Sequence, residues 1–518
     1  MELAALLLLL PFLLAGFLYL RKKDHGDDAR RLPPAPRGLP VIGNLHQVGA
    51  LPHRALHALA AAHGAPDLLL LRLGRVPALV ASSPAAAAEL LRSQDHAFAT
   101  RPYFRTAEIL SYGFRDLVFA PHGEHWRHVR RLCSSHVLSA ARSHRQNAMR
   151  EREVVALVQA VAGQAARSAS AAAVVDVSGA LYRFANDVIC RVVCGRLSRE
   201  EEGRSELLRE LIEESTALLG GFRIGDYFPA LAWADALLPG GGARALKNLR
   251  RWDELLEKVL QEHERRRGGS GDGDDGREED FVDVLLALQE EGGQDGFELT
   301  LDIVKALLGD MFVAGTETTY VTLEWAMSEL IKNPTTMRKL QHEVRSATPT
   351  QSGDIARADT LGAAPYLKAV VKEALRLHPP APLLLPRECM QDSTVLGYHV
   401  AKGTRVFVNA WAINRDPASW HAPEEFLPER FLESDVDFRG RHFQFIPFGA
   451  GRRICPGMQF SLATMELALA NLVRMFDWEL PDGMAPGELD MSDAPGLITA
   501  RRVGLRLVAR PFEWGMQE

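Results

Sequence analysis

A long helical pattern between Thr300 and Asn333 is the feature that most restricts how this chain can fold. Thr300 is a residue type that caps helix N-termini, and Pro334, directly after the pattern, cannot continue a helix. At a rise of about 1.5 Å per residue, such a helix would span roughly 50 Å. We therefore expect a helix that crosses a whole domain, in a 518-residue chain whose 47% hydrophobic content can bury a large core.

The middle of this helix carries an unusual run, Ala314-Gly315-Thr316-Glu317-Thr318-Thr319. Glycine followed by β-branched residues forms helices poorly. The run therefore predicts a local distortion, in which a threonine hydroxyl or a water takes over a backbone bond. One interpretation is a threonine-rich helix packed in a core. A buried, unpaired Glu317 would be costly in such a core, which favours a functional role.

A second unusual stretch lies near the C-terminal end and reads Phe448-Gly449-Ala450-Gly451-Arg452-Arg453-Ile454-Cys455-Pro456-Gly457. Its glycines allow a tight backbone that can approach a flat ligand closely. A cysteine among cations and free backbone N–H groups is favoured as thiolate, and a thiolate is one of the axial ligands of haem iron. The alternative is a glycine-rich turn that happens to hold a buried cysteine.

These stretches carry a resemblance to a known family. The second one fits F-x-x-G-x-R-x-C-x-G, the haem-binding signature of the cytochrome P450 family, with all five fixed positions present, and the run 314–319 resembles that family's oxygen-binding motif. Together with Pro428-Glu429-Arg430-Phe431, they resemble the plant microsomal A-type subset. The resemblance implies a mainly α fold with small β-sheets, in which residues 45–518 form a single large haem domain that binds haem b.

The resemblance also implies catalytic roles. Cys455 is expected to be the axial ligand of the haem iron. Gly315 is expected to leave room for O₂, Thr318 to hydrogen-bond the oxygen and hold a water, and Glu317 to relay protons from solvent. The chemistry needs two protons, so an alcohol next to an acid is a sensible pair for delivering them.

Four further side chains are expected to bind the haem propionates. Trp126 and Arg130 are at i and i+4 and share a helix face, and both carry only hydrogen-bond donors, which suits a carboxylate. The alternative is a basic helix with a packed tryptophan. By resemblance, Arg387 and Arg453 also contact a propionate. The signature itself adds two more cofactor-binding residues, Phe448 and Gly449.

A structural ion-pair triad is expected from a third motif. Glu373 and Arg376 place opposite charges three residues apart on one helix face, which alone is a weak signal. The family locks this pair to a third partner, here Arg430. Removing one member of a buried triad is costly, so the triad is expected to hold the core on the haem side.

The N-terminus predicts membrane attachment. An uncharged apolar run of helix-spanning length ends at Leu20 and is followed by Arg21, Lys22 and Lys23, so residues 1–23 are expected to be an anchor. A cleaved signal peptide is the competing interpretation, but its cations usually precede the apolar run. The proline-rich segment 31–44 is expected to be a stiff hinge. The positive-inside rule then places everything after Arg21 in the cytosol, and the resemblance to microsomal enzymes implies a single-pass protein of the endoplasmic reticulum membrane.

Composition excludes other classes. A net charge of −6 offers no basic surface for nucleic acid. The cysteines are few, odd in number and without C-x-x-C pairing, which argues against a disulfide framework or a zinc site and fits a reducing compartment. Only Cys455 has a chemical context.

Two strand segments complete the prediction. Residues 68–82 are expected to form a small strand pair around Gly74 and Pro77. The apolar run Leu383 to Arg387 is expected to be a strand that lines the pocket, because the prolines before it end a helix.

The expected activity is monooxygenation of a small hydrophobic substrate. O₂ supplies the oxygen, and an NADPH-cytochrome P450 reductase supplies electrons, since no flavin or nicotinamide motif is apparent in the chain. Terpenoid, flavonoid, indole and fatty-acid substrates all stay open. The alternatives are a haem-thiolate isomerase or dehydratase that rearranges a peroxide without O₂ or reductase, and a non-enzymatic haem sensor or carrier. Retention of Glu317 and Thr318 weighs against both.

Overall fold

The computed structural model describes residues 31–166, 173–195, 203–237, 242–268, 279–292, 297–346 and 354–514. The predicted anchor, residues 1–23, lies outside these ranges. Within them, no helix combines the length and the apolar character that crossing a bilayer requires.

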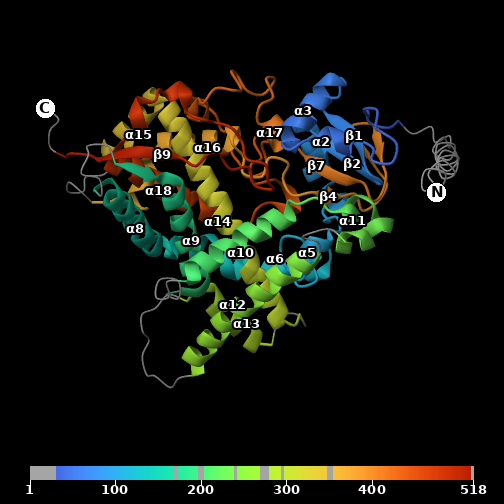
Figure 1. Cartoon of the computed structure of the whole chain (residues 1–518), viewed down its shortest axis with the longest axis horizontal. Helices are drawn as coiled ribbons and strands as arrows, with labels where there is room; N and C mark the ends of the chain where they lie inside the picture. Colours follow the sequence, from blue (N-terminus) through green and yellow to red (C-terminus); the bar gives the residue numbers. More distant parts are fainter. Residues whose placement is uncertain are drawn as a thin grey trace, which may run out of the picture.

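The helix α14 (Leu301–Lys332) runs through the interior of the molecule, as the sequence predicts (Figure 1). Thr300 occupies its N-cap position, although the Thr300 side chain makes no capping bond. Contrary to expectation, α14 is helical throughout the run 314–319. The Thr318 hydroxyl donates to the Ala314 carbonyl at 2.8 Å, which helical geometry permits without breaking the backbone ladder.

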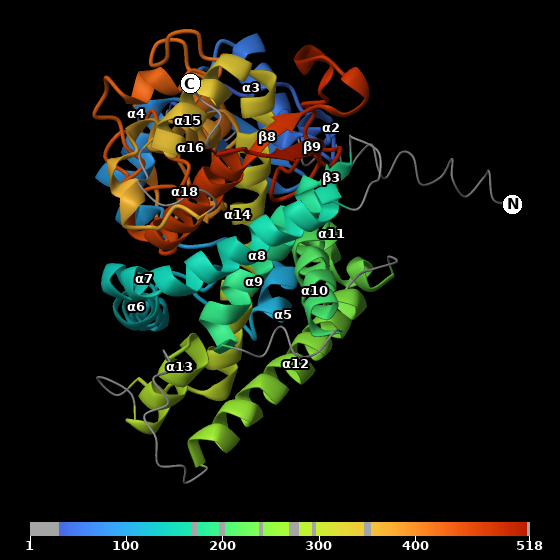
Figure 2. The same cartoon turned by 90° about the vertical axis from the view of Figure 1, so that its left-hand side faces the viewer.

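Three helices make the most extensive contacts with α14 and contribute a large share of the main core: α9 (Val177–Cys194), α16 (Pro365–Leu377) and α18 (Met458–Met475). The other longer helices surround them. They are α3 (Pro52–Ala62), α6 (Glu124–Leu132), α8 (Asn147–Ala166), α10 (Arg204–Leu219), α12 (Gly242–Gly268), α13 (Phe281–Glu290) and α15 (Pro334–Ser346). Figure 2 shows α10 and α12 lying together, away from α15 and α16.

Short helices fill the connections. They are α2 (Leu45–Val48), α4 (Pro84–Ala88), α5 (Arg105–Leu110), α7 (Ala140–Arg145), α11 (Ile224–Tyr227) and α17 (Ala410–Ile413). The segment Pro428–Phe431 forms a 3₁₀ turn that packs on α16.

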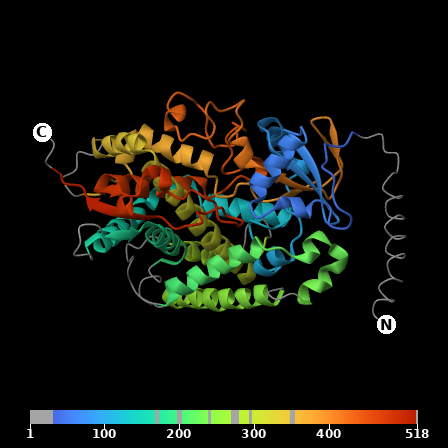
Figure 3. The ribbon, with the colours of Figure 1, turned by 45° about the horizontal axis from the view of Figure 1, so that its top comes forward.

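The strands are few and short. One sheet has the order β1-β2-β7-β4, with β1 (Leu68–Leu73) antiparallel to β2 (Val76–Ala81), and β2 parallel to β7 (Arg405–Val408). A second sheet has the order β3-β9-β8, and β5 pairs with β6. Their bounds are β3 (Val174–Asp176), β5 (Ser393–Val395), β6 (Tyr398–Val400), β8 (Phe476–Glu479) and β9 (Arg506–Pro511). Figure 3 shows β1 and β2 of the first sheet (blue) at one end of the molecule and β8 and β9 (red) at the other.

The predicted strand pair at 68–82 is confirmed, whereas the predicted strand from Leu383 to Arg387 is wrong in most of its length. Only Arg387 and Glu388 pair, as β4. Leu384 has φ of 51°, and its N–H donates to the Ala381 carbonyl at 2.9 Å. These residues therefore form a turn, in which Leu384 and Leu385 line the cavity described below and Leu383 packs against the core beside the first sheet.

The proline-rich segment 31–44 runs along the first sheet. The Leu70 N–H donates to the Pro34 carbonyl at 2.9 Å, and the His399 N–H donates to the Arg31 carbonyl at 2.7 Å. Segment 31–44 is thus tied by its backbone to strands from both halves of the chain.

Candidate active site

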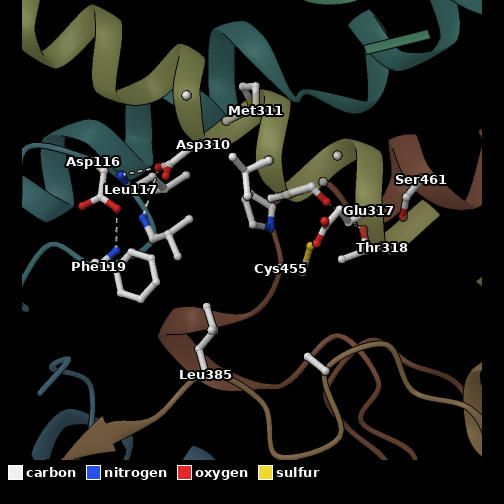
Figure 4. Close-up of a pocket in the computed structure, with 18 of the residues that line it drawn as sticks. Asp116, Leu117, Phe119, Asp310, Met311, Glu317, Thr318, Leu385, Cys455 and Ser461 are labelled. Atoms are coloured by element: carbon white, nitrogen blue, oxygen red, sulfur yellow. Dashed lines mark hydrogen bonds between the residues drawn. The ribbon is translucent and has the colours of Figure 1, made fainter. Parts of the chain in front are cut away.

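A cavity of about 360 Å³ lies where α14 meets the Cys455 loop. Figure 4 shows Cys455, Glu317 and Thr318 among the residues that line it. Every residue predicted to bind the cofactor or to act in catalysis lines this one cavity: Trp126, Arg130, Gly315, Glu317, Thr318, Arg387, Phe448, Gly449, Arg453 and Cys455. Residues from four distant parts of the chain are therefore brought together.

The Cys455 loop is held in a tight backbone conformation. The Cys455 N–H donates to the Phe448 carbonyl at 3.0 Å. Gly449 and Gly451 have φ of 68° and 70°, which residues with a side chain rarely adopt. A Cβ at Gly451 would also fall 2.6 Å from Asp95 Oδ1. Only glycine therefore fits at position 451, because the backbone has a positive φ and there is no room for a side chain.

Opposing effects act on the Cys455 thiol. Burial raises its pKa above the ordinary value, while amide hydrogen bonds from Gly457 and Met458 and the positive charge of Arg130 lower it. Burial is the largest of these effects, and the amides and Arg130 offset it in part. A metal ion at the sulfur would displace the proton, because the thiolate is the form that ligates.

Asp95 connects the Cys455 loop to the first sheet. Its carboxylate accepts from Arg387 Nη1 at 2.8 Å, from the Arg452 backbone N–H at 2.9 Å and from Arg452 Nη1 at 2.9 Å. Arg387 also donates to the Ala450 carbonyl at 2.8 Å. The charge of Arg387 is thus already paired within the protein, in addition to its place in the cavity wall.

Arg453 is fixed by backbone carbonyls. Its guanidinium donates to Ala99 O at 2.8 Å and to Ala120 O at 2.5 Å, and it lies 4.1 Å from the centre of the Trp126 ring. Burial, with a smaller effect from the charge of neighbouring Arg387, lowers the pKa of Arg453 to about 9. The Trp126 indole N–H donates to the Leu117 carbonyl at 3.2 Å.

Arg130 differs from the other arginines of the cavity. It lies half-buried in the wall, yet within the described residues it donates no hydrogen bond and forms no ion pair. Burial lowers its pKa, and the charge of Cys455 raises it. A half-buried guanidinium without a protein partner is expected to have an anionic ligand.

These features fit a haem. A thiol with no disulfide partner is presented into the cavity, and Leu384, Leu385 and Phe448 supply apolar wall for a flat macrocycle. Arg101, Arg130, Arg387 and Arg453 supply positive charge for its two carboxylates. Cys455 would hold the iron, and Arg130 is the guanidinium that has donors to spare for a propionate.

The α14 wall of the cavity carries the acid and the alcohol. Ala314 is exposed even though α14 is an interior helix, because its side chain faces the cavity. Glu317 is 9% exposed. Burial raises the pKa of Glu317 to about 7, a hydrogen bond with Thr216 of α10 lowers it, and the charge of Glu213 raises it. An acid with such a pKa can take up and release protons near neutral pH.

The structural triad is assembled away from the cavity. Arg376 donates from Nε and Nη2 to the two carboxylate oxygens of Glu373, both at 2.8 Å, and Arg430 Nε donates to Glu373 Oε1 at 3.0 Å. Glu373 and Arg376 are fully buried. Arg376 also donates to three backbone carbonyls of the segment that leads to the Cys455 loop: Asn414, Pro423 and Glu425.

Sequence reasoning did not identify several residues of the site. Asp95, Arg101, Asp116 and Asp310 have no motif of their own. Asp95 and Arg387 are 292 positions apart, and Asp310 binds backbone amides some 190 positions away. No local pattern could have revealed these contacts.

A cysteine loop beneath a long helix, with a cavity between them that arginines line, is the arrangement of the haem-thiolate class. Comparison with known proteins then assigns the family. The sequence profile of the family described as Cytochrome P450 matches residues 33–502, and this chain belongs to that family. It is a monooxygenase with a b-type haem.

The relatives are plant enzymes, as the resemblance predicted. The chain is 46% identical to an indolin-2-one monooxygenase of Zea mays, with 92% of this chain and 89% of that protein covered. It is 42% identical to (+)-menthofuran synthase of Mentha piperita, with 96% and 97% covered. Among solved structures, a zebra fish cytochrome P450 with progesterone is 27% identical and has a TM-score of 0.72, with 89% of this chain and 99% of that chain covered.

Proposed function

We propose that this enzyme inserts one oxygen atom from O₂ into a small hydrophobic plant metabolite, with electrons from NADPH delivered by a cytochrome P450 reductase. The observation that carries the proposal is the single cavity that holds Cys455, the Glu317–Thr318 pair and an apolar wall. A haem with a thiolate ligand, when bound, supplies cleavage of the O–O bond. The balanced reaction consumes two electrons and two protons and releases one water.

The residues of α14 are assigned the handling of protons. Glu317 lies between the cavity and α10, where Glu213 is half-exposed to solvent. Protons taken up by Glu317 can thus be passed toward the Thr318 hydroxyl, whose oxygen keeps free lone pairs after it donates to Ala314. Arg130, with Arg453 and Arg387 behind it, is assigned to the haem propionates.

The substrate is assigned to the small apolar heterocycles and terpenoids. Two relatives carry names of this kind, an indolin-2-one monooxygenase and a menthofuran synthase. The cavity supports this choice, since apolar side chains such as those of Leu110, Ile189 and Leu497 are part of its lining. Residues 1–23 are assigned as an anchor in the endoplasmic reticulum membrane, with 31–44 as the connection to a catalytic domain from residue 45 onward.

Isotope labelling tests the proposal. Membranes that carry this protein and a plant reductase would be supplied with ¹⁸O₂, NADPH and a panel that includes indole, indolin-2-one and cyclic monoterpenes. We expect one labelled oxygen in a product, only with NADPH, and no product from Cys455→Ala. A rearranged, unlabelled product formed without NADPH would instead identify a peroxide isomerase. Haem binding by wild type with no turnover of any panel member would contradict the proposed substrate class.

A further inference from the structure

Asp310 joins α14 to the loop formed by residues 116–120. One oxygen of its carboxyl group, Oδ2, accepts from the backbone N–H of Leu117 at 2.8 Å and from that of Val118 at 3.3 Å. Figure 4 shows Asp310 on α14 with Leu117 and Asp116 beside it. Asp310 lies about two helical turns before Glu317 and therefore on the same face of α14.

The loop 116–120 forms a wall of the cavity. Leu117, Val118 and Phe119 line it together with Cys455 and Thr318. The loop has no regular secondary structure, so the positions of its side chains depend on what its backbone is bonded to. Groups from elsewhere must therefore hold this wall in place.

The carbonyls and the amides of this loop are bonded to different parts of the protein. Its carbonyls accept from Arg101 Nε, which binds Val118 O at 3.0 Å, and from Arg453 and Trp126. Of these donors, Arg453 belongs to the Cys455 loop, Trp126 to α6 and Arg101 to the segment before α5 (Arg105–Leu110). Within the described residues, the Leu117 and Val118 amides bind only Asp310. Asp310 thus links the backbone of this loop to α14, in addition to the exposed pair that Asp302 of α14 forms with Arg115 just before the loop.

We propose that Asp310 is a positioning residue that holds Leu117, Val118 and Phe119 at a fixed distance from α14, and thereby sets the size and shape of the ligands that the cavity accepts. The proposal rests on this cavity being the substrate site, as proposed above. It assigns Asp310 no contact with the reacting atoms.

The surroundings explain why an acid can occupy this position without repelling its neighbours. Burial raises the pKa of Asp310 well above its ordinary value, the negative charge of Asp116 raises it further, and the two amides lower it. The other titratable or charged groups nearby are the Cys133 thiol, on the side of α6, and Arg453 and Arg101, which face Asp116. A protonated Asp310 still accepts both amide hydrogen bonds.

Three substitutions separate hydrogen bonding from charge. Asp310→Asn keeps an oxygen that can accept from the amides, while Asp310→Ala and the similarly sized Asp310→Leu do not. The matched control is Asp302→Asn. Asp302 is another acid of α14, and it pairs with Arg115 just before the same loop, but at an exposed position.

The first measurement is hydrogen exchange in a peptide that covers residues 115–120, followed by mass spectrometry on the full chain. We expect Leu117 and Val118 to exchange at least tenfold faster in D310A and D310L, and at the wild-type rate in D310N and D302N. This measurement does not require haem, and D310L keeps the test valid if D310A fails to fold. Wild-type exchange in both apolar variants would overturn the proposal.

The second measurement is the Soret shift on titration with two probes, imidazole and 4-phenylimidazole. We expect the ratio of their dissociation constants to change at least threefold in D310A and D310L and to stay unchanged in D310N and D302N. If D310N behaved like D310A, charge rather than the accepted bonds would matter, and the proposal would be wrong. A wild-type chain that gave no Soret band would contradict the proposed function, while the exchange result would still decide the role of Asp310.

Discussion

Gly315 of α14 lies directly against Ile189 of α9. A Cβ at Gly315 would fall 2.9 Å from Ile189 Cγ1 and closer still to its Cδ1. α9 is the helix that packs most extensively on α14, so Gly315 permits the close approach of these two helices. This packing role stands beside the predicted one of leaving room for O₂.

Substitution of Gly315 by alanine is therefore expected to destabilise the fold by about 1–3 kcal/mol, because the added methyl overpacks the helix contact. A second substitution, Ile189→Ala, removes both clashing atoms, Cδ1 and Cγ1, so Gly315→Ala should cost much less in that background than in wild type. Urea unfolding of the four proteins of this double-mutant cycle measures the coupling. Additive effects of the two substitutions would show that the helix contact does not explain the glycine.

The triad gives a second prediction. Arg376→Ala would leave Glu373 charged and fully buried, with Arg430 as its remaining partner, so we expect a loss of about 3–5 kcal/mol in the free energy of unfolding. Arg376→Lys should rescue little, because an ammonium cannot reproduce the two-pronged bond to the carboxylate.

Denaturant unfolding and haem content together check this prediction. The control is Lys339→Ala, which removes an exposed cation from its ion pair with Glu429 of the same 3₁₀ turn and should change stability by less than about 1 kcal/mol. Equal losses of stability in Arg376→Ala and Lys339→Ala would contradict the assignment of the triad as a stabilising element of the core.

Much of the fold could be predicted because its signals are local. Thr300 and Pro334 mark the two ends of α14 in the sequence. The glycines around Cys455 indicate the tight backbone of its loop. The run 383–387 was wrongly predicted to be a strand. Leu384 and Leu385 are apolar because they line the cavity, and the positive φ of Leu384 places it in a turn.

The site residues that the sequence did not reveal are held by contacts between distant parts of the chain. Asp95 and Asp310 each bind groups that the fold brings from far along the chain. A lone aspartate in sequence is most simply a solvated charge. Only the folded chain shows that one aspartate neutralises Arg387 and Arg452 and that the other holds a cavity wall.

The arginines of the cavity are expected to respond differently to alanine substitution. Arg130→Ala removes a guanidinium that has no hydrogen-bond partner within the described residues, so the protein without haem should keep its stability. Haem should leave roughly tenfold faster, because a charge-assisted bond to a propionate is worth about 1.5–3 kcal/mol. Transfer of haem to an excess of apomyoglobin measures this rate.

Arg453→Ala is the contrasting variant. It strips hydrogen bonds from buried carbonyls of Ala99 and Ala120, so the protein without haem should itself lose about 2 kcal/mol or more. If Arg130→Ala destabilised the haem-free protein as strongly, its guanidinium would have a structural role and not the ligand role assigned to it.

The last prediction concerns Glu317, whose pKa burial raises from 4.5 to about 7. An acid with a higher pKa in the folded than in the unfolded state stabilises the fold while it is protonated. That stability is complete below pH 4.5 and is lost as the pH rises through about 7. For a shift of this size, the loss amounts to about 3 kcal/mol.

Glu317→Gln should therefore remove this pH dependence. Glutamine is neutral and similar in shape, so we expect the variant to match wild type near pH 5 and to exceed it by about 2–3 kcal/mol at pH 8. Its turnover should nevertheless fall, because an amide cannot relay a proton. Urea unfolding between pH 5 and 8 measures the first effect, and NADPH-dependent product formation measures the second.

The control for Glu317→Gln is Glu206→Gln, at an exposed carboxylate of α10, which should change neither the pH dependence of stability nor turnover. A variant that lost stability equally at both pH values would show that Glu317 is ionised throughout this range, and its assignment as a neutral-pH proton carrier would then fail.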